Sequence, residues 1–326
     1  MKPGQAVAEV RPRARRFQAS GTFFALLSAI CYGSMGIFAR LAYGSGMDVP
    51  SLLLLRFAAA TVLLCGMLSS RRFALPRGRG LALLMLMGAL GAGQAFCYFT
   101  ALAHVSAGLA ALLLYTYPAL VALLSRLVLK RPLSSRQIAC VAMSLTGTVL
   151  IIGGVGGGNV LGIAFGLMAA LAYAVYIMAG SSLPAEVSPL GPTAVITGIS
   201  ALVYLGLVAA RGFHPPATGT GALAVAGIAV VCTVLAMLCF FAGLKRVGPV
   251  RASVLATVEP LCAVLLGGAV LGETITPLRV LGGVLIAGAV IILAREKAPV
   301  LNHRRTLRRS HRIDGRHHPG EHPHGG

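Results

Sequence analysis

Residues 97–129 read CYFTALAHVSAGLAALLLYTYPALVALLSRLVL, and residues 239–271 read CFFAGLKRVGPVRASVLATVEPLCAVLLGGAVL. The two stretches are identical at 11 of their 33 positions, and the matches include a proline within each apolar run, Pro118 and Pro260. Shared apolar composition explains some of these identities, but it does not explain the aligned prolines. The second half of the chain therefore repeats the first half.

The composition indicates a membrane protein. Of the 326 residues, 57% are hydrophobic and 11% are charged, whereas a soluble domain has about 25% charged residues because its surface faces water. The net charge of +20 raises the alternative of nucleic-acid binding. The basic residues, however, form short runs between apolar segments or lie in the tails, which is typical of membrane topology signals. We therefore expect membrane lipids, and no nucleic acid, among the partners.

Ten apolar segments are long enough to cross a membrane. An α-helix rises 1.5 Å per residue, so about 20 apolar residues cross about 30 Å of hydrocarbon. The predicted spans are 20–41, 51–69, 80–101, 107–128, 136–153, 159–180, 190–210, 220–243, 249–271 and 277–295. The sequence thus predicts an all-α integral membrane protein with ten transmembrane helices.

The loop charges orient these spans. Basic residues are concentrated in the amino-terminal tail, in the loops 71–79, 126–136 and 245–251, and in the tail from Arg295, whereas the alternate loops carry few. Positive loops stay on the cytoplasmic side, so both termini are predicted to be cytoplasmic in the plasma membrane. The predicted parts are a basic tail (1–19), a five-helix repeat (20–153), a second five-helix repeat (159–295) and a disordered, His-rich basic tail (296–326).

Five spans in each half imply that the second repeat enters the membrane in the opposite orientation. Loops at equivalent positions should then have opposite charge character. Residues 103–104 read AH, and their equivalents 245–246 read KR; residues 130–131 read KR, and their equivalents 272–273 read GE. This antisymmetry favours two inverted repeats over a tandem parallel repeat.

Two residues that are charged at neutral pH fall well inside predicted spans, Arg56 and Glu259. Each costs about 2.5–3.5 kcal/mol at the bilayer centre on insertion scales, so each needs a reason to be there. We expect Glu259 to face a cavity, as a proton-coupling group or as an anchor for a substrate ammonium group. Arg56 is its one deep basic candidate partner, and the alternatives are that Arg56 extends to the membrane surface or that a buried pair only locks helices together.

Other polar side chains within spans are candidates to line a substrate path. They are Tyr32, Gln94, Tyr98, Tyr115, Tyr117, Tyr173 and Tyr176. Each polar group needs a partner away from lipid, and hydrogen bonding between helices is the alternative. Pro118 and Pro260 lack an amide hydrogen and interrupt helical bonding, so they are hinge candidates, with a static kink as the alternative.

The sequence predicts no catalytic residues, no metal site and no cofactor. The seven cysteines form no CxxC pair, and no HExxH motif is present. The segment Gly198-Ile199-Ser200 loosely resembles a serine-protease turn, but no later span contains a histidine. An intramembrane enzyme would need such a base or a metal site, so we do not expect an enzyme.

Four stretches carry a resemblance to a known family: LLLLRF at 52–57, ALAHVSAGLAALLLYTYP at 101–118, GLKRVGPVRASVLATVEP at 243–260 and LLGGAVLGETIT at 265–276. On the basis of these stretches, the chain resembles EamA-type members of the drug/metabolite transporter superfamily over about residues 20–295. The resemblance implies a ten-helix bundle around a central cavity, and alternating access. One departure is Lys130-Arg131, where the family often has Gly-Glu.

The resulting expectation is a secondary-active exporter of small metabolites such as amino acids or drugs. Protons are one candidate coupling ion, and a homodimer is one candidate assembly. A flippase for a lipid-linked carrier would use the same fold and is the main alternative. The identity of the small-molecule substrate is not readable from the sequence.

Overall fold

A computed structural model describes residues 3–69, 78–102, 104–105, 107–130, 132–153, 159–184, 187–271 and 276–295. The predicted tail 296–326 lies outside these residues, as do several of the loop charges used to orient the chain, among them residues 71–77 and 272–273.

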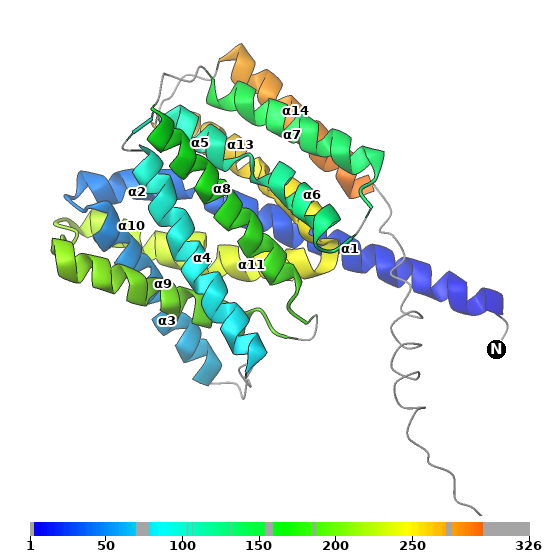
Figure 1. The fold of residues 1–326 in the computed structure, drawn as a ribbon, viewed down its shortest axis with the longest axis horizontal. Helices are drawn as coiled ribbons and strands as arrows, with labels where there is room; N and C mark the ends of the chain where they lie inside the picture. The colour runs from blue at the N-terminus through cyan, green and yellow to red at the C-terminus, as the bar shows by residue number, and fades with distance from the viewer. Residues whose placement is uncertain are drawn as a thin grey trace, which may run out of the picture. The chain divides into compact units, whose positions relative to one another are not determined.

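The described residues are mostly helical (Figure 1). In chain order the elements are α1 (Pro3–Gly33), α2 (Met35–Gly44), α3 (Val49–Ser69), α4 (Arg79–Leu102), α5 (Ala107–Leu114), α6 (Tyr117–Leu127), α7 (Ser135–Ile152), α8 (Val160–Ser181), α9 (Leu190–Arg211), α10 (Gly219–Ala229), the π-helical turn η1 (Val230–Leu235), α11 (Ala236–Val247), α12 (Pro249–Ala256), α13 (Val258–Leu271) and α14 (Pro277–Arg295).

The prediction of ten transmembrane helices is confirmed. Within the described residues, ten continuous or interrupted helices are long and apolar enough to cross a membrane. Most of their ends lie within a few residues of the predicted ends. The largest difference at a single end is in the eighth span, which is predicted over 220–243 and runs from Gly219 to Val247. The protein is therefore a multi-pass membrane protein.

Four of the ten spans are interrupted. The first span breaks at Ser34, and the eighth contains the turn η1. The fourth and ninth spans break at equivalent places, between Leu114 and Tyr117 and at Thr257, just before Pro118 and Pro260. Proline provides no N–H group for the preceding turn, which accounts for a break at this position in both repeats. A hinge role for the two prolines stays a prediction.

The helices of the two halves of the chain pack against each other and do not form two separate bundles. The principal helix pairs are α3 with α9, α4 with α8, α1 with α11 and α7 with α14, and each pair joins one helix from each half. In span numbers these pairs are 2 with 7, 3 with 6, 1 with 8 and 5 with 10. Exchanging the two repeats reproduces the same set of pairs, so the packing follows the sequence repeat. Figure 1 shows α7 and α14 side by side.

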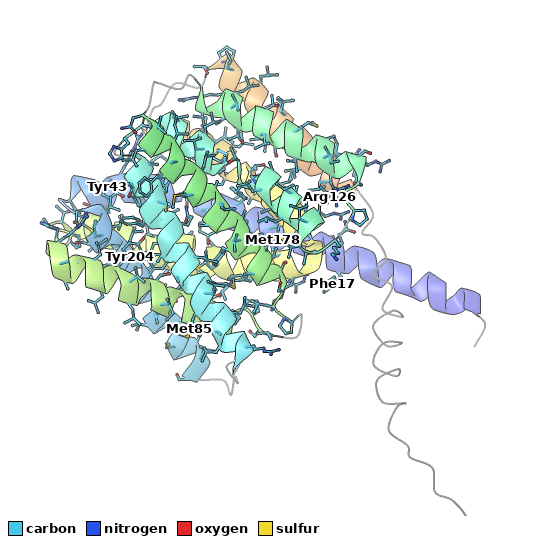
Figure 2. All side chains as sticks on the ribbon, in the orientation of Figure 1. Phe17, Tyr43, Met85, Arg126, Met178 and Tyr204 are labelled. Carbon is cyan, nitrogen blue, oxygen red and sulfur yellow. The ribbon has the colours of Figure 1, made fainter. Side chains whose placement is uncertain are left out.

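Large apolar side chains are exposed around the bundle, as Met85 on α4 illustrates in Figure 2. Val160 is 83% exposed and Leu223 is 74% exposed, and an exterior that exposes many such side chains suits lipid rather than water. Inside the bundle, the largest core cluster includes Leu84, Ile177 and Phe241. The apolar exterior and the packed interior are both consistent with lipid as the surrounding solvent.

Candidate functional site

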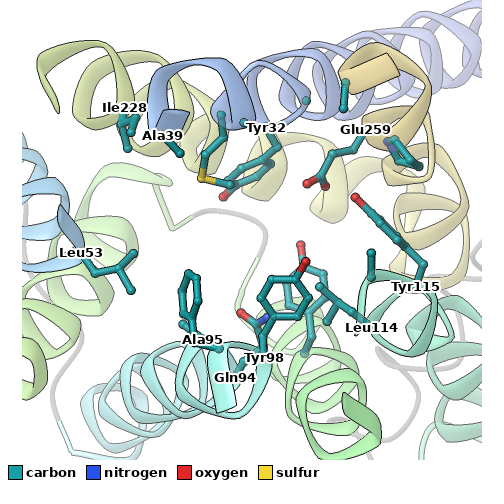
Figure 3. A pocket seen from close by; sticks show the side chains of 18 of the residues that line it. Tyr32, Ala39, Leu53, Gln94, Ala95, Tyr98, Leu114, Tyr115, Ile228 and Glu259 are labelled. Atoms are coloured by element: carbon teal, nitrogen blue, oxygen red, sulfur yellow. The ribbon is translucent and has the colours of Figure 1, made fainter. Parts of the chain in front are cut away.

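A cavity of about 590 Å³ lies between the helices of the two halves, and Figure 3 shows its wall. Such a volume is typical of a site for a small molecule. All nine predicted path residues line this cavity: Tyr32, Arg56, Gln94, Tyr98, Tyr115, Tyr117, Tyr173, Tyr176 and Glu259. Pro260 also lines it, whereas Pro118 is buried and is not among the lining residues. Their roles in transport stay predictions.

The two interrupted spans bring Tyr115 and Glu259 together. Tyr115 follows the last residue of α5, and Glu259 lies in the first turn of α13, directly after the break at Thr257. The Tyr115 hydroxyl points toward the Glu259 carboxyl group and lies within hydrogen-bonding reach of it (Figure 3). Because the breaks are equivalent in the two repeats, the repeat itself creates this side of the cavity.

Arg56 lies on α3 and is held by contacts from both halves of the chain. Its Nε donates to Thr233 Oγ1 at 2.7 Å, and one Nη donates to the Cys232 carbonyl oxygen at 3.4 Å. The other Nη donates to Met35 Sδ at 3.1 Å, and the guanidinium carbon lies 4.9 Å from the centre of the Phe57 ring. These contacts hold the guanidinium group at the cavity wall.

Arg56 and Glu259 share the cavity without forming a salt bridge. Within the described residues, neither Arg56 nor Glu259 takes part in an ion pair within 4.0 Å, whereas His214 lies 3.6 Å from Asp48. The sequence left open whether Arg56 and Glu259 pair directly, and in this conformation they do not. Two opposite charges instead face the same cavity at separate places.

Four tyrosine rings that line the cavity pack against one another in a row. The ring centres of Tyr115 and Tyr117 are 6.2 Å apart, those of Tyr117 and Tyr173 are 4.7 Å apart, and those of Tyr173 and Tyr176 are 6.0 Å apart. The Tyr117 hydroxyl donates to the Ser253 carbonyl oxygen at 3.4 Å. Rings of this kind present both an apolar face and a hydroxyl group to a ligand.

The sequence reasoning missed several lining residues. Tyr43, Phe99, Ser200 and Arg279 also line the cavity. Phe99 directly follows the predicted Tyr98, and the presence of two adjacent aromatic residues within one span could have identified it as a candidate. Arg279 is the third residue of α14. Charged residues are common at the ends of membrane-spanning helices, so its sequence position did not indicate that it lines the cavity.

One assignment of a loop charge was wrong. The charge pattern groups Arg251 with the basic loop at 245–251, but the side chain is 4% exposed and lies within α12. A guanidinium group keeps its charge and requires hydrogen-bond acceptors when it is buried. Gly248, which has φ of 81°, separates α11 from α12, and α12 begins at Pro249 as predicted for the ninth span, so Arg251 is the third residue of a packed helix.

Two successive segments, residues 19–153 and 160–295, each match the EamA-like transporter family. The chain belongs to this family. The two matches divide the chain as the sequence repeat does, with one family domain for each set of five spans. The resemblance inferred from the motifs is thus confirmed.

Relatives of known sequence are named as transporters. The chain is 29% identical over 288 residues to "Uncharacterized transporter YcbK" of Bacillus subtilis (strain 168), covering 82% of this chain and 90% of that relative. It is 27% identical over 251 residues to "Threonine/homoserine exporter RhtA" of Escherichia coli (strain K12), covering 75% and 81% respectively. A solved crystal structure superposes with a TM-score of 0.74 at 22% identity, covering 85% of this chain and 99% of that one, which establishes the similarity of the fold.

Proposed function

We propose that the protein is a secondary-active exporter that carries a small zwitterionic metabolite, such as an amino acid, across the plasma membrane by alternating access. The observation that carries this proposal is the pair of opposite charges on one cavity, Arg56 and Glu259, which do not pair with each other. In this proposal the carboxylate of the substrate binds near Arg56, and its ammonium group binds near Glu259.

The cost of burying charge supports a zwitterion. Each intramembrane charge costs about 2.5–3.5 kcal/mol on insertion scales, and an ion pair between Arg56 and Glu259 would reduce that cost. The protein keeps the two apart and surrounds them with tyrosines. A ligand with both charges satisfies Arg56 and Glu259 at once, whereas a ligand with one charge supplies a counterion to only one of them.

The position of the cavity supports alternating access. Its lining residues include Tyr43 at the end of α2, Leu52 near the start of α3 and Ile152 at the end of α7. For helices that each cross the bundle, these ends lie on the side opposite the amino terminus. Residues of the largest core cluster, such as Leu84 and Leu183, belong to the other side. A site reached from one side and closed by packing on the other suits a transporter built from two repeats.

The orientation in the membrane is part of the proposal. The basic loops predict cytoplasmic termini, so the cavity side would face away from the cytoplasm. The antisymmetric loop charges and the odd number of spans in each repeat support an inverted second repeat. The name of the relative RhtA, a threonine/homoserine exporter, supports both the direction of transport and the amino-acid class. The proposal assigns no enzyme activity.

Glu259 is the proposed coupling group. A carboxyl group far from water is stabilised either by a proton or by a cation beside it. Binding of a substrate ammonium group to the Glu259 carboxylate therefore competes with binding of a proton. In an exchange cycle the substrate ammonium leaves on one side of the membrane and a proton takes its place for the return. One proton then enters for each substrate that is exported.

A matched ligand series tests the charge assignment. Purified protein is screened by thermal shift against the proteinogenic L-amino acids and L-homoserine, and then against 3-aminopropan-1-ol and 4-hydroxybutanoate, which lack the carboxylate and the ammonium group of homoserine respectively. A specific ligand raises the apparent unfolding temperature as its concentration exceeds its Kd. We expect homoserine to bind at least about tenfold more tightly than either analogue, a difference of about 1.4 kcal/mol.

Transport is then measured with protein reconstituted in liposomes. We expect counterflow of labelled L-homoserine that is accelerated by a pH gradient, and we expect Glu259→Gln to lose both transport and its dependence on the gradient. If Glu259→Gln transports homoserine at the wild-type rate and keeps the dependence on the pH gradient, the coupling role of Glu259 is contradicted. Stabilisation by a lipid-linked sugar and by none of the amino acids would favour the flippase alternative and overturn the proposed substrate class.

A further inference from the structure

The eighth span contains a π-helical turn, η1, directly beside Arg56. A π-helical turn takes in one extra residue and frees a backbone carbonyl from its usual partner, and such turns are frequent at functional sites. Here the Thr233 hydroxyl donates to the carbonyl oxygen of Ile228, five residues earlier, at 2.9 Å. The Thr233 side chain thereby links the irregular segment to a carbonyl group in the last turn of α10.

The same hydroxyl group is an acceptor for Arg56. Thr233 is fully buried, and its Oγ1 accepts from Arg56 Nε at 2.7 Å. A hydroxyl group has one hydrogen to donate and two lone pairs to accept. With its hydrogen directed at Ile228, the lone pairs of Thr233 face the guanidinium group. The π-helical turn therefore fixes the orientation of the acceptor that holds Arg56.

Two further acceptors complete this arrangement. The Cys232 carbonyl oxygen, also within η1, accepts from Arg56 at 3.4 Å. On the other side, Met35 begins α2 directly after the break at Ser34, and its Sδ accepts from Arg56 at 3.1 Å. The sulfur atom is a weak acceptor, so the short bond to Thr233 is the strongest of the three contacts.

We infer that Thr233 is a positioning residue, which holds the Arg56 guanidinium group in place for the carboxylate of the substrate and so sets selectivity for substrates that carry one. The inference rests on the proposed function, because it takes Arg56 as the carboxylate-binding group. Without the Thr233 hydroxyl, Arg56 loses its shortest hydrogen bond and can turn toward other acceptors. Affinity for the carboxylate should then fall, while the ammonium site at Glu259 is unaffected.

Binding measurements with two ligands test this selectivity. The ligands are L-homoserine and 3-aminopropan-1-ol, which share the ammonium group and differ in the carboxylate. Thr233→Val keeps the shape of the side chain and removes the hydroxyl, and Thr233→Ser keeps the hydroxyl. We expect Thr233→Val to bind homoserine about tenfold more weakly, as for a lost bond to a charged group, and to bind the amine within about twofold of wild type. Thr233→Ser should restore homoserine binding.

A matched control separates positioning from general packing. Thr61 lies on α3 like Arg56, and its hydroxyl contacts the Phe57 carbonyl oxygen of the same helix at 2.7 Å and Thr197 Oγ1 of α9 at 3.0 Å. Thr61→Val removes this bond between helices without touching Arg56, so it should leave the preference for homoserine over the amine unchanged. Thr233→Cys, which substitutes a weaker acceptor, is a second variant and should show the same selective loss as Thr233→Val.

A double-mutant cycle adds a stricter criterion. If Thr233 acts through Arg56, then Thr233→Val should not weaken homoserine binding further in an Arg56→Gln background. Equal loss of both ligands in Thr233→Val, unchanged binding of both, or additive losses in the double mutant would overturn the inference and leave the proposed function standing. If the unaltered protein bound homoserine no better than the amine, the proposed function itself would fail.

Discussion

At Gly33 two helices pack closely against each other in the wall of the cavity. Gly33 ends α1 and faces α13, and it lines the cavity. A Cβ atom at this position would lie 2.7 Å from Cys262 Cβ and 2.8 Å from the Glu259 carbonyl oxygen. Ordinary contact begins near 3.4 Å. In Gly33→Ala, α1 and α13 must therefore separate by about 0.6 to 0.7 Å, since neither neighbouring atom can rotate away.

This separation has two expected consequences. Overpacking in a tight interface costs about 1–3 kcal/mol, and the better helix propensity of alanine offsets up to about 1 kcal/mol of it. The apparent unfolding temperature should therefore fall by a few degrees. The separation also displaces Glu259 from Tyr115, so affinity should fall for homoserine and 3-aminopropan-1-ol alike, by about three- to tenfold.

The matched control is Gly36→Ala. Gly36 lies three residues further along and also lines the cavity, but a Cβ atom added to it would have no neighbouring atom within 4 Å. Gly36→Ala should retain or raise the unfolding temperature, because alanine is the better helix former. Thermal shift and ligand titration on both variants check the prediction. If Gly33→Ala unfolds and binds as Gly36→Ala does, then close packing of α1 on α13 does not position Glu259.

Three further predictions concern stability and are measured as apparent unfolding temperatures in detergent. Gly147→Ala should destabilise by about 1–3 kcal/mol, because its Cβ would lie 2.6 Å from the Gly282 carbonyl oxygen; an unchanged temperature would contradict close contact of α7 and α14. Ser134→Ala should cost about 1 kcal/mol, because it removes the capping box at the start of α7, and Ser134→Asp should recover most of the loss. Tyr204→Phe should cost about 0.5–1.5 kcal/mol, because its hydroxyl donates to the Ala92 carbonyl oxygen at 3.2 Å; no loss would mean that this bond adds nothing to the packing of α9 on α4.

Much of the candidate site was predictable because polar groups are conspicuous in apolar spans. Arg56, Glu259 and the tyrosines within spans are costly in lipid, and this cost alone identified residues that prove to line one cavity. Arg279 and Arg251 were missed for the opposite reason. Charged residues near helix ends are common in membrane proteins, so the sequence does not indicate which of them face the interior of the bundle.

The ten spans and the repeat are properties of the sequence by itself, because the thickness of the bilayer sets helix length and apolar composition sets where each helix lies. The breaks before Pro118 and Pro260 also follow from local chemistry, since proline lacks the N–H group. The relation between Arg56 and Glu259 does not. It depends on the π-helical turn, on the break at Thr257 and on helices from opposite halves packing together.

Tertiary structure was needed for that relation because side-chain partners here are far apart in the chain. Arg56 and Thr233 are separated by 177 residues, and depth in the membrane cannot indicate which side chains meet at a given level. The sequence identified the two intramembrane charges and left their pairing open. The packed bundle directs Arg56 toward Thr233 and Glu259 toward Tyr115, so that both charges face one cavity without neutralising each other.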